Sequence, residues 1–246
     1  RGPVPLWVAG VALGAYVALI LAGVFILRLA MFVDVLSRGP RDACGVALTF
    51  DDGPSPEHTP RVLEMLEEAG IKATFFVIGR KAEAHPDLIK RIADAGHALG
   101  VHSYAHDRLF SIRTPDVVRA DLARAIQAIE AATGKVPTLF RPPIGHTSPR
   151  MAQALASFDL RVIGWSVRGL DGLAGAQPER VARRIVPALR DGAIVLLHDA
   201  AERDDHAPAS LAALPRILDA MRAQNLAGVR VDRWLDEAED DAEKPG

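Results

Sequence analysis

Short apolar runs with β propensity alternate with amphipathic helical segments along most of this sequence of 246 residues. The strand-like runs are residues 45–50, 73–78, 98–101, 138–140, 161–165, 193–197 and 228–231. Segments with helical periodicity lie between them, at residues 60–69, 86–95, 115–132, 149–157, 178–190 and 209–223. Strands and helices that alternate in this way form βαβ units, which build a parallel sheet. The sequence therefore predicts an α/β fold with a parallel sheet, either open or closed into a barrel.

The beginning of the chain differs from the rest, because residues 4–27 form a stretch of 24 residues without any charge. As a helix, this stretch is long enough to cross roughly 30 Å of hydrocarbon. It is longer than the apolar part of a signal peptide, and no small-residue cleavage site follows it. We therefore predict a transmembrane anchor over residues 1–34 and a polar linker over residues 35–44. A cleaved signal peptide and a buried core helix are the alternatives.

Composition excludes two classes of protein. The 29 basic and 31 acidic residues nearly cancel, leaving a formal net charge of −2. This balance lacks the basic surface that nucleic-acid binding requires, so we expect no nucleic-acid partner. The single cysteine, Cys44, excludes an intrachain disulfide. Residues 236–246 are strongly acidic and are predicted to form a solvated tail.

Several polar side chains stand at the points where predicted strands end. They are Asp51 and Asp52, His102 and His106, Arg141, and His198. In a (β/α) barrel the carboxyl ends of the strands meet on one face, where active sites are built. The sequence therefore predicts one polar site at this face.

The residue types in this group are those of a hydrolytic metal site. If the loop after residues 98–101 makes a helical turn, His102 and His106 share one face. Two imidazoles and one carboxylate leave a coordination position open, as in catalytic zinc sites. The second aspartate could then accept a proton from the attacking water. A nearby arginine would keep that base ionised, and a further histidine could protonate a leaving amine.

The stretches "TFDDGPS", "HSYAH", "RPPIG" and "LLHD" occur in this order along the chain. In order and spacing they resemble the motifs of the polysaccharide deacetylases with a NodB homology domain, carbohydrate esterase family 4. The resemblance covers residues 45–235 and implies a distorted (β/α) barrel of the NodB type. The activity it implies is removal of N-acetyl groups from an N-acetylated glycan of the cell-wall or exopolysaccharide type.

The resemblance also implies a role for each matching residue. These roles are general base for Asp51, general acid for His198, metal ligand for Asp52, His102 and His106, orientation of the base for Arg141, and support of the catalytic histidine for Asp171. The residues expected to contact the sugar are Tyr104, Pro143 and Trp165. We expect Zn²⁺ as the metal, although Co²⁺, Ni²⁺ or Fe²⁺ would also suit two histidines and one carboxylate.

One motif departs from the family pattern. The family has Trp-Ser/Thr-x-Asp-x-x-Asp-Trp, whereas this chain has "WSVRGLDGL", with Arg168 at the first acidic position and Gly172 at the closing tryptophan. Loss of the large ring should open the wall of the groove beside the acid. Two alternatives therefore accompany the deacetylase interpretation: a metal-dependent amidase acting on a small non-sugar amide, and a non-catalytic glycan-assembly protein with the same fold.

The membrane orientation can be argued in two ways. Arg28, Arg38 and Arg41 follow the apolar stretch and Arg1 precedes it, so a count of positive charges places the domain in the cytoplasm. The family resemblance places it outside. We expect a single-pass protein of the cytoplasmic (inner) membrane with an extracytoplasmic catalytic domain.

Overall fold

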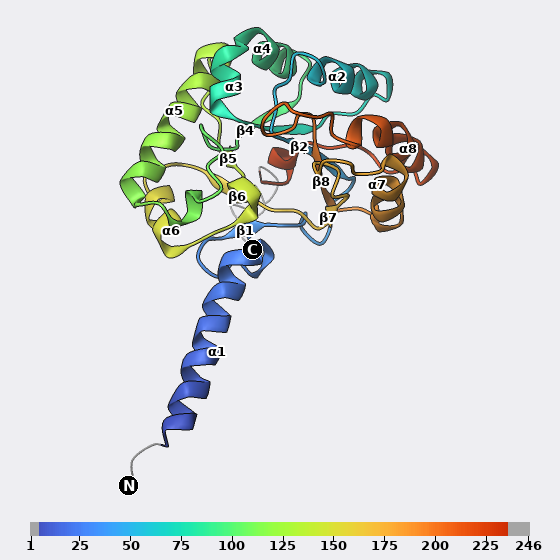
Figure 1. Ribbon diagram of the computed structural model, residues 1–246. Helices are drawn as coiled ribbons and strands as arrows, with labels where there is room; N and C mark the ends of the chain where they lie inside the picture. The colour runs from blue at the N-terminus through green and yellow to red at the C-terminus, as the bar shows by residue number, and fades with distance from the viewer. Residues whose placement is uncertain (1–4, 236–246) are drawn as a thin grey trace, which may run out of the picture.

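The computed structural model describes residues 5–235, and these contain one sheet of eight parallel strands (Figure 1). The strands are β1 (Val35–Leu36), β2 (Ala47–Asp51), β3 (Thr74–Val77), β4 (Ala98–Val101), β5 (Leu139–Phe140), β6 (Arg161–Ile163), β7 (Val167–Arg168) and β8 (Ile194–His198). Their order in the sheet is β1-β6-β5-β4-β3-β2-β8-β7. The sheet curls, and no ladder among the described residues joins its two ends. The predicted distorted (β/α) barrel is therefore confirmed, as a barrel open between β1 and β7.

Helices surround this sheet (Figure 1). They are α2 (Thr59–Glu68), α3 (Gly79–Ala84), α4 (Pro86–Asp94), α5 (Pro115–Thr133), α6 (Pro149–Leu155), α7 (Pro178–Ile185) and α8 (Ser210–Ala223). Four of them, α4 to α7, begin with proline, whose fixed φ and missing N–H suit the first helical position. α5 ends where Gly134 takes the left-handed conformation. The helix predicted over 178–190 stops at Ile185, because Pro187 follows and a short 3₁₀ turn, η4 (Val186–Ala188), replaces the last turn.

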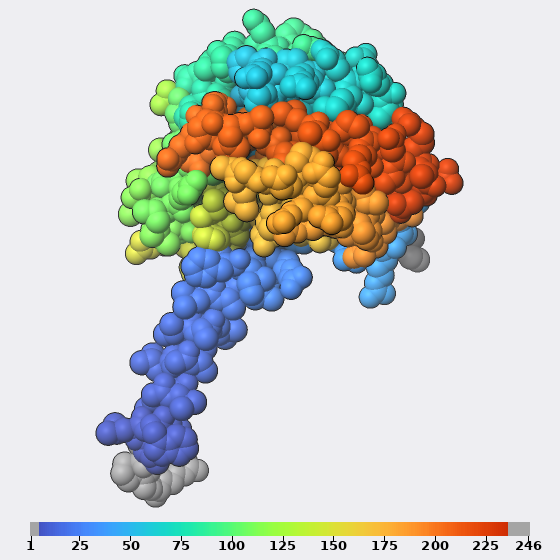
Figure 2. Space-filling model, turned by 45° about the vertical axis from the view of Figure 1, so that its right-hand side comes forward, coloured from blue at the N-terminus to red at the C-terminus, as the bar shows by residue number. Residues whose placement is uncertain are grey.

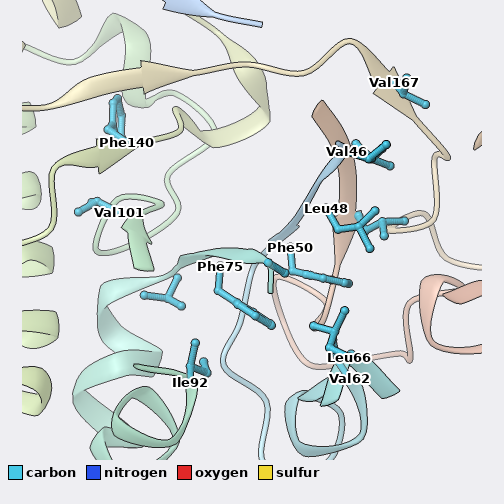
Figure 3. Close-up of a cluster of buried hydrophobic side chains, with 14 of the residues drawn as sticks. Val46, Leu48, Phe50, Val62, Leu66, Phe75, Ile92, Val101, Phe140 and Val167 are labelled. Carbon is cyan, nitrogen blue, oxygen red and sulfur yellow. The ribbon is translucent and has the colours of Figure 1, made fainter. Parts of the chain in front are cut away.

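The hydrophobic core lies between the sheet and these helices (Figure 3). Phe50 on β2 stacks on Phe75 on β3, with ring centroids 5.1 Å apart. Val62 and Leu66 of α2 belong to the same buried cluster. Full burial of one such side chain stabilises the folded chain by about 1.5–3 kcal/mol. All five residues of β2 are buried, as expected for a strand of a parallel sheet covered on both faces.

Four details differ from the sequence-based expectation. β1 lies inside the predicted linker and pairs with β6 through Val35–Val162 and Leu36–Ile163. β7 and α3 were not predicted, because two and six residues are too few for a periodic pattern to emerge. The strand expected at 228–231 amounts to a single bridge between Val46 and Gly228. These four details are β1, β7, α3 and the segment 228–231, whereas the predicted acidic tail, residues 236–246, lies outside the described residues and stays a prediction.

Helix α1 (Leu6–Phe25) extends away from the barrel (Figure 1). It is the one helix among the described residues that is long and apolar enough to cross a membrane. Only 6% of its most apolar window is buried, which excludes the core-helix alternative. The chain re-enters the domain directly after α1, because Leu27, in the 3₁₀ turn η1 (Leu27–Leu29), belongs to the main hydrophobic core.

Candidate metal site and catalytic cavity

A cavity of ≈ 350 Å³ opens at the carboxyl ends of the strands. The predicted site residues that line it are Asp51, Asp52, His102, His106, Trp165, Asp171 and His198. Asp51 and His198 are the last residues of β2 and β8, and His102 directly follows β4. Arg141, which directly follows β5, is fully buried and donates to Asp51. The four strand ends therefore converge as the sequence predicted.

Asp52, His102 and His106 form a cluster that could hold a metal ion, with one ligand atom from each lying within 4.8 Å of the others. Asp52 Oδ1 lies 3.2 Å from His106 Nε2 and 3.5 Å from His102 Nε2. All three side chains are buried. Such a compact group of two nitrogens and one oxygen matches the ligand set of a three-ligand catalytic metal site.

The hydrogen bonding of this cluster tests whether a cation fits. His102 Nδ1 lies 2.7 Å from the carbonyl oxygen of Arg141, so Nδ1 carries the proton and donates. Burial lowers the pKa of His102 to about 3, and the ring is therefore neutral with a lone pair on Nε2. Asp52 Oδ1, which faces this lone pair, is buried and has no hydrogen-bond partner. Electron-rich atoms that converge without a proton between them fit a divalent cation.

The two histidines are brought together by a bent loop and not by the helical turn that their spacing suggested. Residues 102–106 are not helical, and Ser103 and His106 have φ values of 60° and 53°. The Ser103 hydroxyl accepts a hydrogen bond from the His106 N–H at 2.9 Å. Asp52 also has a positive φ, 72°. Left-handed backbone at three non-glycine residues of one site is costly, and such outliers concentrate at functional sites.

Arg141 and Asp51 form a buried ion pair beside this cluster. Arg141 Nη1 donates to Asp51 Oδ1 at 2.7 Å and to Thr49 Oγ1 at 2.8 Å. The rest of the guanidinium donates to the backbone carbonyls of Ile163 and Gly164 and stacks over a phenylalanine ring of β3. Burial raises the pKa of Asp51 above its ordinary range, and the charge and hydrogen bond of Arg141 oppose this rise. Asp51 is thus a carboxylate whose proton affinity is increased and whose position is fixed.

His198 and Asp171 form a second pair. Asp171 is fully buried. Its Oδ2 accepts a hydrogen bond from the His198 backbone N–H at 2.8 Å and lies 3.3 Å from Nδ1 of the His198 ring. Burial disfavours the imidazolium, but the charge and hydrogen bond of Asp171, together with the charges of Asp52 and Asp51, outweigh this effect and raise the pKa of His198 to about 10. At neutral pH His198 is therefore protonated, with Nε2 left as a donor.

The structure does not bring every predicted sugar-contacting residue to the cavity. Tyr104 does not line it: the Tyr104 hydroxyl bonds to Glu83, and the Arg124 guanidinium lies 3.9 Å over its ring. Pro143 is buried, and its neighbours Pro142 and Ile144 line the cavity in its place. Trp165 lines the cavity as predicted.

Sequence analysis missed several charged residues of the cavity, and two of them, Glu202 and Arg108, lie next to the candidate metal cluster. Glu202 lines the cavity, and its Oε2 lies 3.6 Å from the otherwise unpartnered Nδ1 of His106. Arg108 donates to the same oxygen from Nε and Nη2, at 3.1 and 2.9 Å. Neither residue follows a strand directly, so the rule that found the other site residues could not find them.

Gly172 does not simply open the cavity wall. A Cβ atom at this position would lie 2.9 Å from the His198 ring, so the glycine backbone packs directly against the imidazole. Its carbonyl oxygen lies 3.1 Å from Nε2 of His206, another cavity residue. Leu173, 61% exposed, also lines this side. The wall beside His198 is therefore made by Leu173 and His206 in the absence of a tryptophan.

A family model described as polysaccharide deacetylase matches residues 38–163. The chain belongs to the polysaccharide deacetylase family. Among curated relatives of this family, a chitooligosaccharide deacetylase of Sinorhizobium fredii is 35% identical over 202 residues, which are 77% of this chain and 92% of the relative. A peptidoglycan-N-acetylglucosamine deacetylase of Bacillus cereus is 31% identical over 186 residues, 76% of this chain and 66% of the relative. The corresponding Listeria monocytogenes enzyme is 35% identical over 195 residues, 78% of this chain.

This polysaccharide deacetylase chain spans 66% of the length of the Bacillus cereus relative and 39% of the Listeria monocytogenes one. Two solved structures extend the comparison. A carbohydrate esterase family 4 pseudoenzyme from Bacillus anthracis has a TM-score of 0.74 at 28% identity, over 83% of this chain and 69% of that one. A family 4 acetyl xylan esterase from Clostridium thermocellum, in complex with a cobalt ion, has a TM-score of 0.70 at 31% identity, over 78% of this chain and 90% of that one.

Proposed function

We propose that this polysaccharide deacetylase is a metal-dependent hydrolase that removes N-acetyl groups from an N-acetylated glycan. One observation carries the proposal: a candidate metal cluster, a buried base and a protonated acid meet at a single cavity. Hydrolysis of an amide needs these parts together, because water must be activated and the amine must be protonated as it leaves.

The chain's own residues supply the proton transfers. Asp51 takes a proton from the attacking water, and Arg141 holds the Asp51 carboxylate in place. The water oxygen bonds to the acetyl carbon, the C–N bond breaks, and acetate forms. His198 donates its proton to the sugar nitrogen, and Asp171 holds the ring. Water and amide are thereby converted to acetate and an amine.

Asp52, His102 and His106 would hold the metal ion. When bound, a divalent ion supplies Lewis-acid polarisation of the carbonyl and makes water more acidic. The two imidazoles and one carboxylate support Zn²⁺, with Co²⁺, Ni²⁺ and Fe²⁺ as further ions that suit these ligands. The cobalt complex of the Clostridium thermocellum relative supports this range.

The sugar would lie against Trp165 and Leu173, two of the large apolar side chains at the cavity wall. A glycan is supported as the substrate class because the relatives are named for peptidoglycan and chitooligosaccharide. The pseudoenzyme from Bacillus anthracis has this fold, so the fold alone does not establish catalysis. What favours an active enzyme here is that both proton-transfer pairs are in contact, Arg141 with Asp51 at 2.7 Å and His198 with Asp171 at 3.3 Å.

We further propose that α1 is retained as a membrane anchor of the cytoplasmic membrane, with the catalytic domain outside. Its 20 residues match about 30 Å of hydrocarbon. Leu27 is buried in the domain core and β1 pairs with β6 soon afterwards. Such packing supports an anchor over a cleaved signal peptide, whose removal would strip part of the core.

Acetate release from N-acetylated oligosaccharides by the full chain in detergent tests the proposed activity. We expect release that stops after treatment with a chelator and returns on addition of Zn²⁺ or Co²⁺. A protein that binds the glycan without releasing acetate under any metal would support the non-catalytic alternative. Hydrolysis of small non-sugar amides alone would support the amidase.

A further inference from the structure

The loop that follows β5, residues 141–148, lies between the catalytic cavity and helix α1. On one side, Pro142, Ile144 and Gly145 line the catalytic cavity. On the other side, Thr147 contacts the last turn of α1: its N–H donates to the Val24 carbonyl at 3.2 Å and its hydroxyl to the Gly23 carbonyl at 3.1 Å. The same short loop is therefore both a wall of the cavity and the support of the apolar helix.

The two hydrogen bonds from Thr147 satisfy carbonyl groups at the end of α1. The last four carbonyl groups of a helix have no partner within it, and Thr147 supplies donors to two of them. Thr147 is only 2% exposed, and the neighbouring His146 ring meets the Phe25 ring edge-on at a centroid distance of 4.7 Å. Leu27 then packs into the core. Helix α1 is thus fixed to the cavity loop and is not a flexible tether.

The dimensions place the cavity near the membrane surface. A helix of 20 residues spans about 30 Å, the thickness of the hydrocarbon core, so Gly23 and Val24 lie at its boundary. The head-group layer beyond is about 5–8 Å thick on each side. Gly145 is two residues from Thr147 and hence at most about 7 Å away. The cavity rim at Gly145 therefore lies within or just above the head groups.

Exposed apolar side chains lie on the rim at Ile144 and beside the end of α1. Ile144 is 44% exposed and has a positive φ of 50°, an unusual conformation for a β-branched residue. Phe25 and Met31, beside the end of α1, are 58% and 40% exposed. In the space-filling view, the end of α1 in blue lies directly below the yellow-green surface of the domain (Figure 2). Apolar side chains are suited to the boundary between head groups and acyl chains, where they can contact lipid.

Given the proposed deacetylase activity, on which this inference rests, we propose that the substrate is an N-acetylated glycan still joined to a membrane lipid. The enzyme would act on the sugars closest to the lipid. A cavity held at head-group depth can reach those sugars, whereas a polymer farther from the membrane would have to fold back to enter it.

The experiment uses the full chain reconstituted in lipid vesicles. The probes are an N-acetylglucosamine tetrasaccharide coupled to a lipid through a short spacer, the same compound with a long flexible spacer, and the free tetrasaccharide. Both lipid-coupled probes are equally concentrated at the surface, so only the height of the sugar differs. We expect deacetylation of the short-spacer probe to be about tenfold faster than that of the long-spacer probe, with the sugar next to the lipid modified first.

Equal rates on the two lipid-coupled probes, or a preference for the long spacer, would overturn the inference while leaving the deacetylase proposal intact. Absence of acetate from all three probes would contradict the deacetylase proposal itself. The two failures are therefore distinguishable.

The depth of the rim can also be measured without activity. In a Cys44→Ser background, a fluorophore is attached at Ile144→Cys and quenched by lipids that carry a nitroxide on the head group. Glu68→Cys, on the exposed surface of α2 and far from α1 in Figure 1, is the matched control. We expect strong quenching at position 144 and none at position 68. Equal weak quenching at both positions would show that the cavity stands clear of the membrane.

Discussion

Two carboxylate–cation pairs stand at the cavity, and they differ in which partner is the more deeply buried. In the first, the Arg141 side chain is fully buried and that of Asp51 is 5% exposed. In the second, the carboxylate is the deeper partner: Asp171 is 1% exposed and His198 is 20% exposed. In each pair the deeper group is a fixed charge and the shallower one is the group that we propose to move a proton. The comparison shows that a buried group of opposite charge can position either a general base or a general acid.

The largest effect should come from removing the shallow partner of the first pair. Asp51→Asn keeps the size of the side chain but removes the base, so kcat should fall by about 10²–10⁴-fold. Bound metal, measured by elemental analysis, should stay near one ion per chain. Asp52→Asn is the matched control, because it removes a proposed ligand and should lower metal content. If Asp51→Asn emptied the site and Asp52→Asn did not, the two aspartates would have exchanged roles.

Removing the shallow partner of the second pair should have a smaller, substrate-dependent effect. With His198→Ala the amine must leave unprotonated, and deacetylation of an N-acetyl sugar should slow by about 10²-fold. An aryl acetate ester has a leaving group that needs no proton, so its hydrolysis should change little. The ratio of the two rates is the measurement. An equal loss on both substrates would mean that His198 acts before the leaving-group step.

Sequence analysis found both pairs because every member except Asp171 directly follows or ends a strand, where parallel strands must converge. Asp171 came from the family resemblance. Tyr104 does not line the cavity, and it stands in a loop whose backbone bends at Ser103 and His106, which residue type does not reveal. β1 escaped prediction because two residues at a sheet edge acquire strand character only from their partner, β6. Such features depend on tertiary contacts.

Glu202 forms another carboxylate–histidine contact at the cavity, with His106. His106 Nδ1 lies 3.6 Å from Glu202, against 3.3 Å between His198 and Asp171. A carboxylate behind a ligating histidine orients the ring and increases its basicity, and loss of such a partner costs 10–100-fold in metal affinity. We expect Glu202→Gln to weaken metal binding by about tenfold, the low end, because the contact is longer than a hydrogen bond.

Competition with a chromogenic chelator measures this affinity. Glu83→Gln is the matched control, since Glu83 bonds to Tyr104 and Arg124 away from the cavity. An unchanged affinity in Glu202→Gln would show that Arg108, and not His106, is the true partner of this carboxylate.

The smallest effect should be a shift in pH dependence when the deep partner of the second pair is neutralised. His198 works as an acid only while protonated, so activity should fall as pH rises through its pKa, which Asp171, with smaller contributions from Asp52 and Asp51, raises to about 10. In Asp171→Asn the carboxylate charge is lost while burial still disfavours the imidazolium, so the pKa of His198 must fall. The basic limb of the kcat–pH profile should then move to lower pH, by at least about one unit, while the acidic limb, which belongs to Asp51, stays in place. A basic limb that did not move would mean that the fixed charge of Asp171 does not prepare the acid, and the symmetry between the two pairs would fail.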